Sequence, residues 1–173
     1  GGNSTSVAWG DYDNDGDIDA VVANTSNQDE VLLRNDGGGT FTKVTLTGTG
    51  GDSYGVSWGD HDNDGDLDVL VSNYLGQAGF VLRNDGAGVL TKVTLPGTDG
   101  TPSFSLGSTW GDFDGDGDLD ALVANDLGRN ETLLRNDVSV SHSSPVVSVS
   151  GFSSSFAEYS VSSTSGVLTL HWG

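Results

Sequence analysis

The chain of 173 residues contains no cysteine, no methionine, three prolines and only six Lys and Arg residues. Without cysteine no disulfide can hold the fold, and thiols say nothing about the redox compartment. Six basic residues against 25 acidic ones exclude the clustered positive charge that nucleic-acid binding needs. No apolar stretch approaches the roughly 20 residues of a membrane-spanning helix. We therefore expect neither a nucleic-acid partner nor a membrane span.

The formal net charge of −19 is concentrated in a few places. Fifteen of the 25 acidic residues lie in three stretches that each run from a tryptophan into an apolar segment. These stretches are WGDYDNDGDIDAVVAN from Trp9, WGDHDNDGDLDVLVSN from Trp58 and WGDFDGDGDLDALVAN from Trp110, with ten of 16 positions identical in all three. So much like charge beside an apolar segment repels itself, and something must neutralise it.

The three stretches belong to a longer repeat. A second block, LLRND or VLRND, places an arginine 25 residues after each of these tryptophans, and the tryptophans are 49 and 52 residues apart. This period is typical of a propeller blade or a solenoid unit. We predict repeats at about 1–50, 51–100 and 101–137, followed by a Ser/Val-rich β segment at 138–173.

Each repeat predicts four β-strands. In the first repeat the runs SVAWG, IDAVVAN, EVLLRN and FTKVTL are rich in β-branched and aromatic residues and are separated by Gly, Asn and Asp. The second run is apolar on both faces, as in an inner strand. The third repeat has no counterpart of TKVTL. The fold class is therefore all-β, a propeller-like array of about three four-stranded blades.

The aspartates have the spacing of a calcium loop. Ligands at positions 1, 3, 5 and 9, a glycine at position 6 for the sharp turn and a backbone carbonyl at position 7 would supply the hard oxygens that calcium prefers. We predict about three calcium ions. The predicted ligands are Asp11, Asp13, Asp15, Asp17 and Asp19; Asp60, Asp62, Asp64, Asp66 and Asp68; and Asp112, Asp114, Asp116, Asp118 and Asp120, with Asp17, Asp66 and Asp118 acting through the carbonyl.

Other acidic loops fit less well. An EF-hand needs an acid at position 12 and flanking helices, but position 12 is Val22, Val71 or Val123. Type 3 thrombospondin repeats are stapled by cysteine, which is absent. The remaining alternative is a set of solvated Asp-rich turns without metal.

The DxDxDGDxD loop between a Trp-Gly strand and an apolar strand resembles the FG-GAP or VCBS repeat family, which includes the integrin alpha-subunit β-propellers. The likeness covers residues 5 to about 137. It implies that each repeat is a four-stranded blade and that the calcium loop joins two adjacent strands. Members include adhesion receptors, lectin-like proteins and accessory domains of enzymes, so the resemblance does not name the function.

Several other residues have alternative interpretations. The repeated tryptophans form either a core between blades, which we favour, or platforms for carbohydrate. The basic residues Arg34, Arg83, Arg135, Lys43 and Lys92 are expected to pair with aspartates or neighbouring blades. We interpret His61 as an exposed side chain that is not a ligand. No catalytic constellation surrounds His142 or His171, so no enzyme is predicted. Asn3, Asn24 and Asn130 match the N-glycosylation pattern.

Three blades are too few to close a propeller, which usually has about four to eight. The segment 138–173 either completes a blade or starts another β unit, and its LHWG ending resembles the start of a further repeat. The opening GGNSTS, without Met, suggests a processed or excerpted piece. Exposed strand edges predict self-association, which three calcium ions would favour by bringing the charge from −19 to about −13.

The function we predict is that of a non-enzymatic, extracellular or cell-surface, calcium-binding module for adhesion or for building a surface or filamentous assembly. Two alternatives stay open. One is a glycan-binding, lectin-like propeller, and the other is an accessory domain of a secreted hydrolase or lyase. The partner of the module is therefore a protein, a glycan or another copy of the chain.

Overall fold

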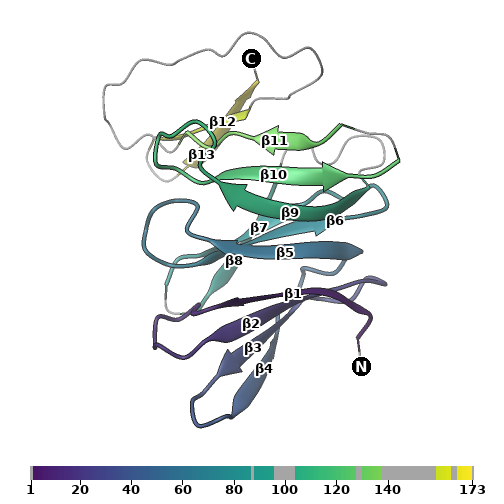
Figure 1. Ribbon diagram of the computed structural model, residues 1–173, viewed down its shortest axis with the longest axis vertical. Helices are drawn as coiled ribbons and strands as arrows, with labels where there is room; N and C mark the ends of the chain where they lie inside the picture. Colours follow the sequence, from purple (N-terminus) through teal and green to yellow (C-terminus); the bar gives the residue numbers. More distant parts are fainter. Residues whose placement is uncertain are drawn as a thin grey trace.

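The computed structural model describes residues 2–86, 88–95, 104–127, 130–137, 159–164 and 167–172, the last two ranges by their backbone alone. Every regular element in these ranges is a β-strand, which confirms the all-β prediction. The strands form antiparallel sheets of 4, 4 and 3 strands and a separate two-stranded hairpin. The three sheets are stacked in chain order, as Figure 1 shows. We call them blades 1, 2 and 3.

Within each blade the strands follow one another in sheet order. Blade 1 contains β1 (Ser4–Gly10), β2 (Asp19–Asn24), β3 (Val31–Asn35) and β4 (Phe41–Thr45). Blade 2 contains β5 (Ser53–Gly59), β6 (Asp68–Asn73), β7 (Phe80–Asn84) and β8 (Leu90–Thr94). Blade 3 contains β9 (Ser105–Gly111), β10 (Asp120–Asn125) and β11 (Thr132–Leu134), and the hairpin contains β12 (Tyr159–Thr164) and β13 (Val167–Trp172). Among the described residues blade 3 has three strands, in keeping with the missing TKVTL counterpart, and most of the segment 138–173 lies outside the described residues.

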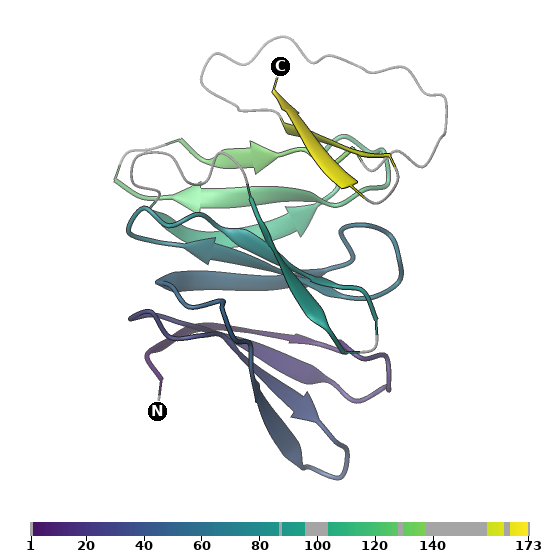
Figure 2. The ribbon, with the colours of Figure 1, turned by 180° about the vertical axis from the view of Figure 1, so that it is seen from behind.

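The acidic stretches connect the first strand of each blade to the second. Gly10 pairs with Asp19 at the end of the β1–β2 ladder, so the acidic loop closes this hairpin. The same pairing joins Gly59 to Asp68 in blade 2 and Gly111 to Asp120 in blade 3. The first strands of consecutive blades lie beside one another, since β5 contacts both β1 and β9. Figure 2 shows the same stack from behind.

The hydrophobic core lies between the blades. Val21 and Ala23 of blade 1 pack against Val56, Val71 and Phe80 of blade 2, and all five are buried. A second cluster joins Leu70 and Val81 of blade 2 to Ala121 and Leu134 of blade 3. The second strand of blade 2 is buried along its whole length. This confirms the prediction of an inner strand, which needs apolar residues on both faces.

The repeated tryptophans of blades 2 and 3 lie between blades. The ring of Trp58 packs so closely on Gly10 that a Cβ there would come within 2.9 Å of it. Trp110 has the same relation to Gly59, at 2.5 Å. Trp9 has no preceding blade within the described residues and is 64% exposed. The part of the chain that the structure describes contains no helix with the length and hydropathy of a membrane span.

Candidate metal centre

The first aspartate of each loop sets the turn. The two carboxylate oxygens of Asp11 accept hydrogen bonds from the backbone amides of Asp15, at 3.1 Å, and Gly16, at 3.0 Å. The corresponding aspartates, Asp60 and Asp112, hold the corresponding amides of their own loops. The glycine at position 6 has a φ of 91° to 97° in all three copies, a conformation that side chains with a Cβ rarely adopt.

Carboxylates from positions 1, 3 and 5 converge in the first two loops. In loop 1, oxygens of Asp11, Asp13 and Asp15 all lie within 4.8 Å of one another. In loop 2 the same holds for Asp60, Asp62 and Asp64. Loop 3 instead brings together the aspartates of positions 1, 3 and 9, which are Asp112, Asp114 and Asp120. The structure therefore gathers predicted ligands within each loop, as one hard cation would require.

One oxygen in loop 2 fits a cation directly. The Oδ1 atom of Asp62 is buried and has no hydrogen-bond partner, an arrangement that is costly for a carboxylate unless a positive charge neutralises it. Burial raises the pKa of Asp62, His61 lowers it in part, and the charges of Asp68 and Asp64 raise it further.

Loop 1 is crowded in the same way. Partial desolvation raises the pKa of Asp13 although its side chain is exposed, and the negative charges of Asp15, Asp19 and Asp11 add to that effect. Carboxylate and carbonyl oxygens are the ligands that calcium takes, in flexible geometry and with six to eight of them. The donors present in these loops therefore fit calcium better than a softer metal.

The aspartate at position 9 is also a structural brace. Asp19 is fully buried and accepts hydrogen bonds from the amides of Tyr12, at 2.9 Å, and Asn35, at 2.7 Å. These amides belong to loop position 2 and to the end of the third strand, so one carboxylate ties the loop to its own sheet. Asp68 and Asp120 make the equivalent pairs of bonds. Burial raises the pKa of Asp120, although its two amide donors offset part of the rise.

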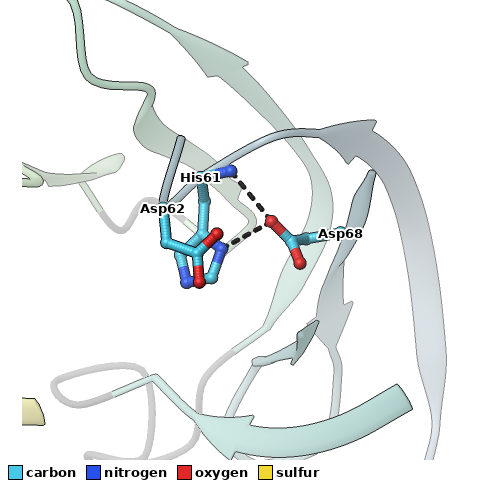
Figure 3. Close-up of side chains that lie close together, drawn as sticks. All are labelled: His61, Asp62 and Asp68. Carbon is cyan, nitrogen blue, oxygen red and sulfur yellow. Dashed lines mark hydrogen bonds and ion pairs between the residues drawn. The ribbon is translucent and has the colours of Figure 1, made fainter. Parts of the chain in front are cut away.

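Loop 2 departs from the prediction at His61. We expected an exposed side chain, but 13% of the His61 side chain is exposed, and its Nδ1 atom lies 2.6 Å from Oδ2 of Asp68. Figure 3 shows both of these residues beside Asp62. The ring also packs near that of Trp110, with centroids 5.9 Å apart. Burial lowers the pKa of His61, but the hydrogen bond and charge of Asp68 outweigh it, so the pKa is raised.

In loops 2 and 3 the side chain at position 7 is directed to the preceding loop. Asp66 accepts a 2.7 Å hydrogen bond from the side-chain amide of Asn14, and Asp118 accepts a 2.6 Å bond from Asn63. Among the described residues no carboxylate cluster that could hold a metal ion includes a position-7 side chain, which agrees with the expectation that position 7 would contribute only its carbonyl. We call the two Asn–Asp bonds the loop staples. Sequence reasoning missed them, although position 4 is Asn in loops 1 and 2.

The Asn of the RND block forms a second connection that the sequence analysis missed. The side chain of Asn84 donates a 2.7 Å hydrogen bond to the carbonyl of Tyr12, and Asn136 donates a 2.6 Å bond to the carbonyl of His61. Both bonds cross from one blade to the loop of the preceding blade. The sequence feature that could have predicted these two bonds is the fixed distance between the Trp and RND blocks in every repeat.

The charged residues of the RND block pair as predicted. Arg34 and Arg83 form ion pairs with the aspartate two residues later. Arg135 bridges Asp137, at 2.6 Å, and the loop residue Asp114, at 2.8 Å. Asp137 thereby joins Asp114 and Asp116 in a further carboxylate cluster. The sequence analysis did not include Asp137 in the site.

The three glycosylation patterns lie in different surroundings. Asn3 and Asn130 are exposed. Asn24 is 3% exposed, and its side-chain nitrogen donates a 2.8 Å hydrogen bond to the carbonyl of Asp29. The side-chain amide of Asn24 is therefore committed to the fold.

Comparison with known proteins supports the repeat family. Residues 11–71 match the family model described as FG-GAP-like repeat. This range runs from the first aspartate of loop 1 to Val71, inside the second strand of blade 2, and so contains both complete acidic loops of blades 1 and 2. The resemblance drawn from the Trp-Gly and aspartate motifs is confirmed for this part of the chain. A search of curated proteins finds no match.

Proposed function

Taking the FG-GAP-like repeat as the starting point, we propose that the chain is a non-catalytic, extracellular module that binds about three calcium ions and serves adhesion or the building of a surface assembly. One observation carries the calcium proposal: the same acidic loop occurs three times, and each copy gathers carboxylates within 4.8 Å of one another. The buried, unpartnered Oδ1 atom of Asp62 adds to it.

The protein ligands of each ion would come from one loop. Positions 1, 3, 5 and 9 would supply carboxylates and position 7 its carbonyl, as predicted from the spacing. Bound calcium supplies positive charge, and with it the neutralisation that the crowded aspartates of loops 1 and 2 need. The side chain at position 2 differs between copies, being Tyr12, His61 and Phe113. No one side chain is therefore shared by the three copies at this position, which supports a structural role for the loops.

The extracellular location rests on affinity. Calcium sites of extracellular modules typically bind with dissociation constants of about 10⁻⁴ to 10⁻³ M. Such sites fill outside cells, where calcium is abundant. The loops are short and partly exposed, with Asp13 and Asp15 open to solvent, which suits affinities in this range.

Calorimetric titration of the chelator-treated chain with calcium tests the proposal, together with melting curves at each calcium concentration. We expect about three ions per chain and a melting temperature that rises at millimolar calcium, because a ligand that binds the folded state stabilises it. Magnesium at the same concentration is the control and should act more weakly, since it prefers a stricter octahedron. A melting temperature unchanged by excess chelator would contradict the proposal.

Glycan binding is a second candidate function, and an aromatic row favours it. Tyr54 and Tyr74 have ring centroids 5.0 Å apart, and Phe104 follows Tyr74 at 4.8 Å. Tyr54 is 36% exposed, and exposed aromatic rings can stack on sugars. Trp58 and Trp110 do not supply such a platform because they pack between blades. A glycan array with the chain and its Tyr54→Ala variant tests this, and binding that the substitution leaves unchanged would exclude the aromatic row as the site.

A further inference from the structure

Trp9 and Gly111 lie at opposite ends of the stack, and each is open where its equivalents inside the stack are in contact. Trp58 packs on Gly10 and Trp110 packs on Gly59. Trp9 is 64% exposed, however, and a Cβ at Gly111 would meet no atom of the described residues within 4 Å. We call the surface of blade 1 that carries Trp9 the back face, and the surface of blade 3 that carries Gly111 the front face.

The back face of blade 1 repeats the surface that blade 2 buries. Val7 is 56% exposed, whereas its equivalent Val56 is 7% exposed against blade 1. Ile18 is 50% exposed, whereas its equivalent Leu67 lies 3.0 Å from the Cβ position of Gly10. The same side chains that hold blade 2 on blade 1 are thus uncovered on blade 1 itself.

The front face of blade 3 repeats the surface that blade 1 buries. Leu122 is 42% exposed, whereas its equivalent Val21 is fully buried. Phe113 is 52% exposed, whereas Tyr12 at the same loop position is 5% exposed. The two apolar end faces are complementary. The back face has its residues at the positions with which blade 2 contacts blade 1, and the front face has its residues at the positions with which blade 1 contacts blade 2.

We propose that a second copy of the chain binds head to tail, with the back face of its blade 1 on the front face of blade 3. Trp9 of one copy then covers Gly111 of the next. This inference rests on the proposed function, as it names the partner of the assembly module. The two surfaces differ, so every bound copy leaves one front face and one back face free. Such contacts produce a ring if the rotation closes and a filament if it does not.

The polar contacts between blades provide a comparison for the strength of the proposed contact between copies. Asn35, Asn84 and Asn136 each donate to a carbonyl of their own blade, but among the described residues Asn84 and Asn136 alone also donate to the preceding blade. In the head-to-tail contact Asn35 faces the loop of Phe113. Loop 3 has Gly115 at position 4 in place of Asn, so this interface has no loop staple. The contact between copies is therefore weaker than the contact between blades, as reversible assembly requires.

The test compares the 173-residue chain with two variants in millimolar calcium. Sedimentation velocity over a wide range of protein concentration measures the self-association of each. Trp9→Ala removes the back-face anchor, and Gly111→Ala places a Cβ where Trp9 of the next copy would pack. Neither substitution disturbs a contact that the described residues make, so the melting temperatures at low concentration should match that of the wild type. We expect either substitution to weaken self-association by about tenfold or more, as overpacking or loss of a buried aromatic does.

Mixing the two variants separates this geometry from strand-edge pairing. Trp9→Ala keeps an intact front face and Gly111→Ala keeps an intact back face, so an equimolar mixture should form one-to-one pairs and stop there. A wild-type chain that stays monomeric, or association that neither substitution weakens, would overturn the proposal. Melting curves with calcium and with chelator on the same samples report on the calcium proposal independently. A monomer that calcium stabilises would contradict the proposed interface but not the calcium sites. A melting temperature that does not depend on calcium would contradict the calcium sites but not the interface.

Discussion

The side-chain amide of Asn14 donates a 2.7 Å hydrogen bond to the carboxylate of Asp66, which lies 52 residues later in the loop of the next blade. Asn63 and Asp118 repeat the bond between loops 2 and 3 at 2.6 Å. Loops 2 and 3 therefore each give one of their five carboxylates to the preceding loop. This arrangement couples the metal loops to the stacking of the blades, because a loop that changes shape also pulls on the next one.

The loop staple between Asn63 and Asp118 should appear as a coupling energy. Asn63 has a φ of 58°, so Asn63→Gly removes the amide without backbone strain. Together with Asp118→Ala and the double variant it forms a thermodynamic cycle. We expect a coupling of about 1.5 to 3 kcal/mol in the free energy of unfolding, the usual contribution of a hydrogen bond to a charged group. Urea unfolding at a fixed calcium concentration measures it.

Asp17→Ala is the matched control for this cycle. Asp17 holds the same loop position as Asp66 and Asp118, but it is exposed and belongs to the first blade. Its substitution should change the free energy of unfolding little, as is usual for surface sites. A coupling energy of zero between Asn63 and Asp118 would show that the loops are independent of one another.

Two aspartates of loop 2 should differ in their effect on stability without calcium. Asp62 has a buried oxygen without a partner, whereas Asp68 accepts backbone hydrogen bonds from His61 and Asn84. Asp62→Asn should therefore weaken calcium binding but leave the melting temperature in chelator unchanged or higher, because it relieves repulsion. Asp68→Ala should lower the melting temperature in chelator as well, since it strands two buried amides at a cost of about 1 to 3 kcal/mol each.

Melting curves of both variants, with calcium and with chelator, compare the two roles. Asp66→Ala is the control for the ligand register, since its backbone carbonyl stays in place and only the staple is lost. It should cost less calcium affinity than Asp62→Asn. Equal losses of calcium affinity in Asp62→Asn and Asp66→Ala would show that the ligand register is wrong.

Sequence reasoning recovered the fold because the signals were local and repeated. The Trp-Gly pair, the apolar second strand and the RND block each mark one element, and the structure places all of them as expected in blades 1 and 2. The loop geometry also followed from spacing, since Gly16 and its equivalents adopt the predicted turn. What spacing could not give was the direction of side chains between repeats. Asn14 and Asn84 contact residues 52 and 72 positions away, which depends on how one blade lies on the next.

The error at His61 has the same cause. Position 2 faces the next blade, so its exposure depends on whether a blade follows: Tyr12 is 5% exposed and Phe113 is 52% exposed. In the middle repeat the following blade covers His61, and the Nδ1 atom of its ring lies 2.6 Å from Oδ2 of Asp68. A sequence read one repeat at a time contains no information on this covering.

The stability cost of a Gly→Ala substitution should depend on whether the tryptophan of a following blade packs on that glycine. Gly59→Ala places a Cβ within 2.5 Å of the Trp110 ring, whereas at Gly111 the same Cβ has no neighbour within 4 Å in the part of the chain that the structure describes. We expect Gly59→Ala to cost about 1 to 3 kcal/mol in the free energy of unfolding through overpacking. Gly111→Ala at low protein concentration should cost little. Urea unfolding of both variants decides, and equal effects would mean that the tryptophans do not hold the blades together.

Glu30 should make the contact between blades 1 and 2 sensitive to pH. Glu30 is fully buried, with 0% of its surface exposed, and neither of its carboxylate oxygens has a hydrogen-bond partner. The nearby hydroxyls of Thr49 and Ser53 donate to other acceptors, the carbonyl of Leu46 and the side chain of Asn73. Burial therefore raises the pKa of Glu30 above its ordinary value of 4.5, although Ser53, Thr49 and Lys92 lower it in part.

A carboxyl whose pKa is raised on folding contributes stability that is fully present below the unfolded value and is lost as pH rises through the folded value. Glu30→Gln mimics the neutral form at every pH, so its stability relative to wild type should grow as pH rises from about 4.5 toward neutrality. Urea unfolding of both proteins across this range measures the difference, and the titration of the acidic loops cancels because both proteins share it. Glu131, the exposed equivalent in blade 3, supplies the control. Glu131→Gln should show no such growth, and a Glu30→Gln difference that stays constant or shrinks with pH would mean that Glu30 is charged in the folded chain.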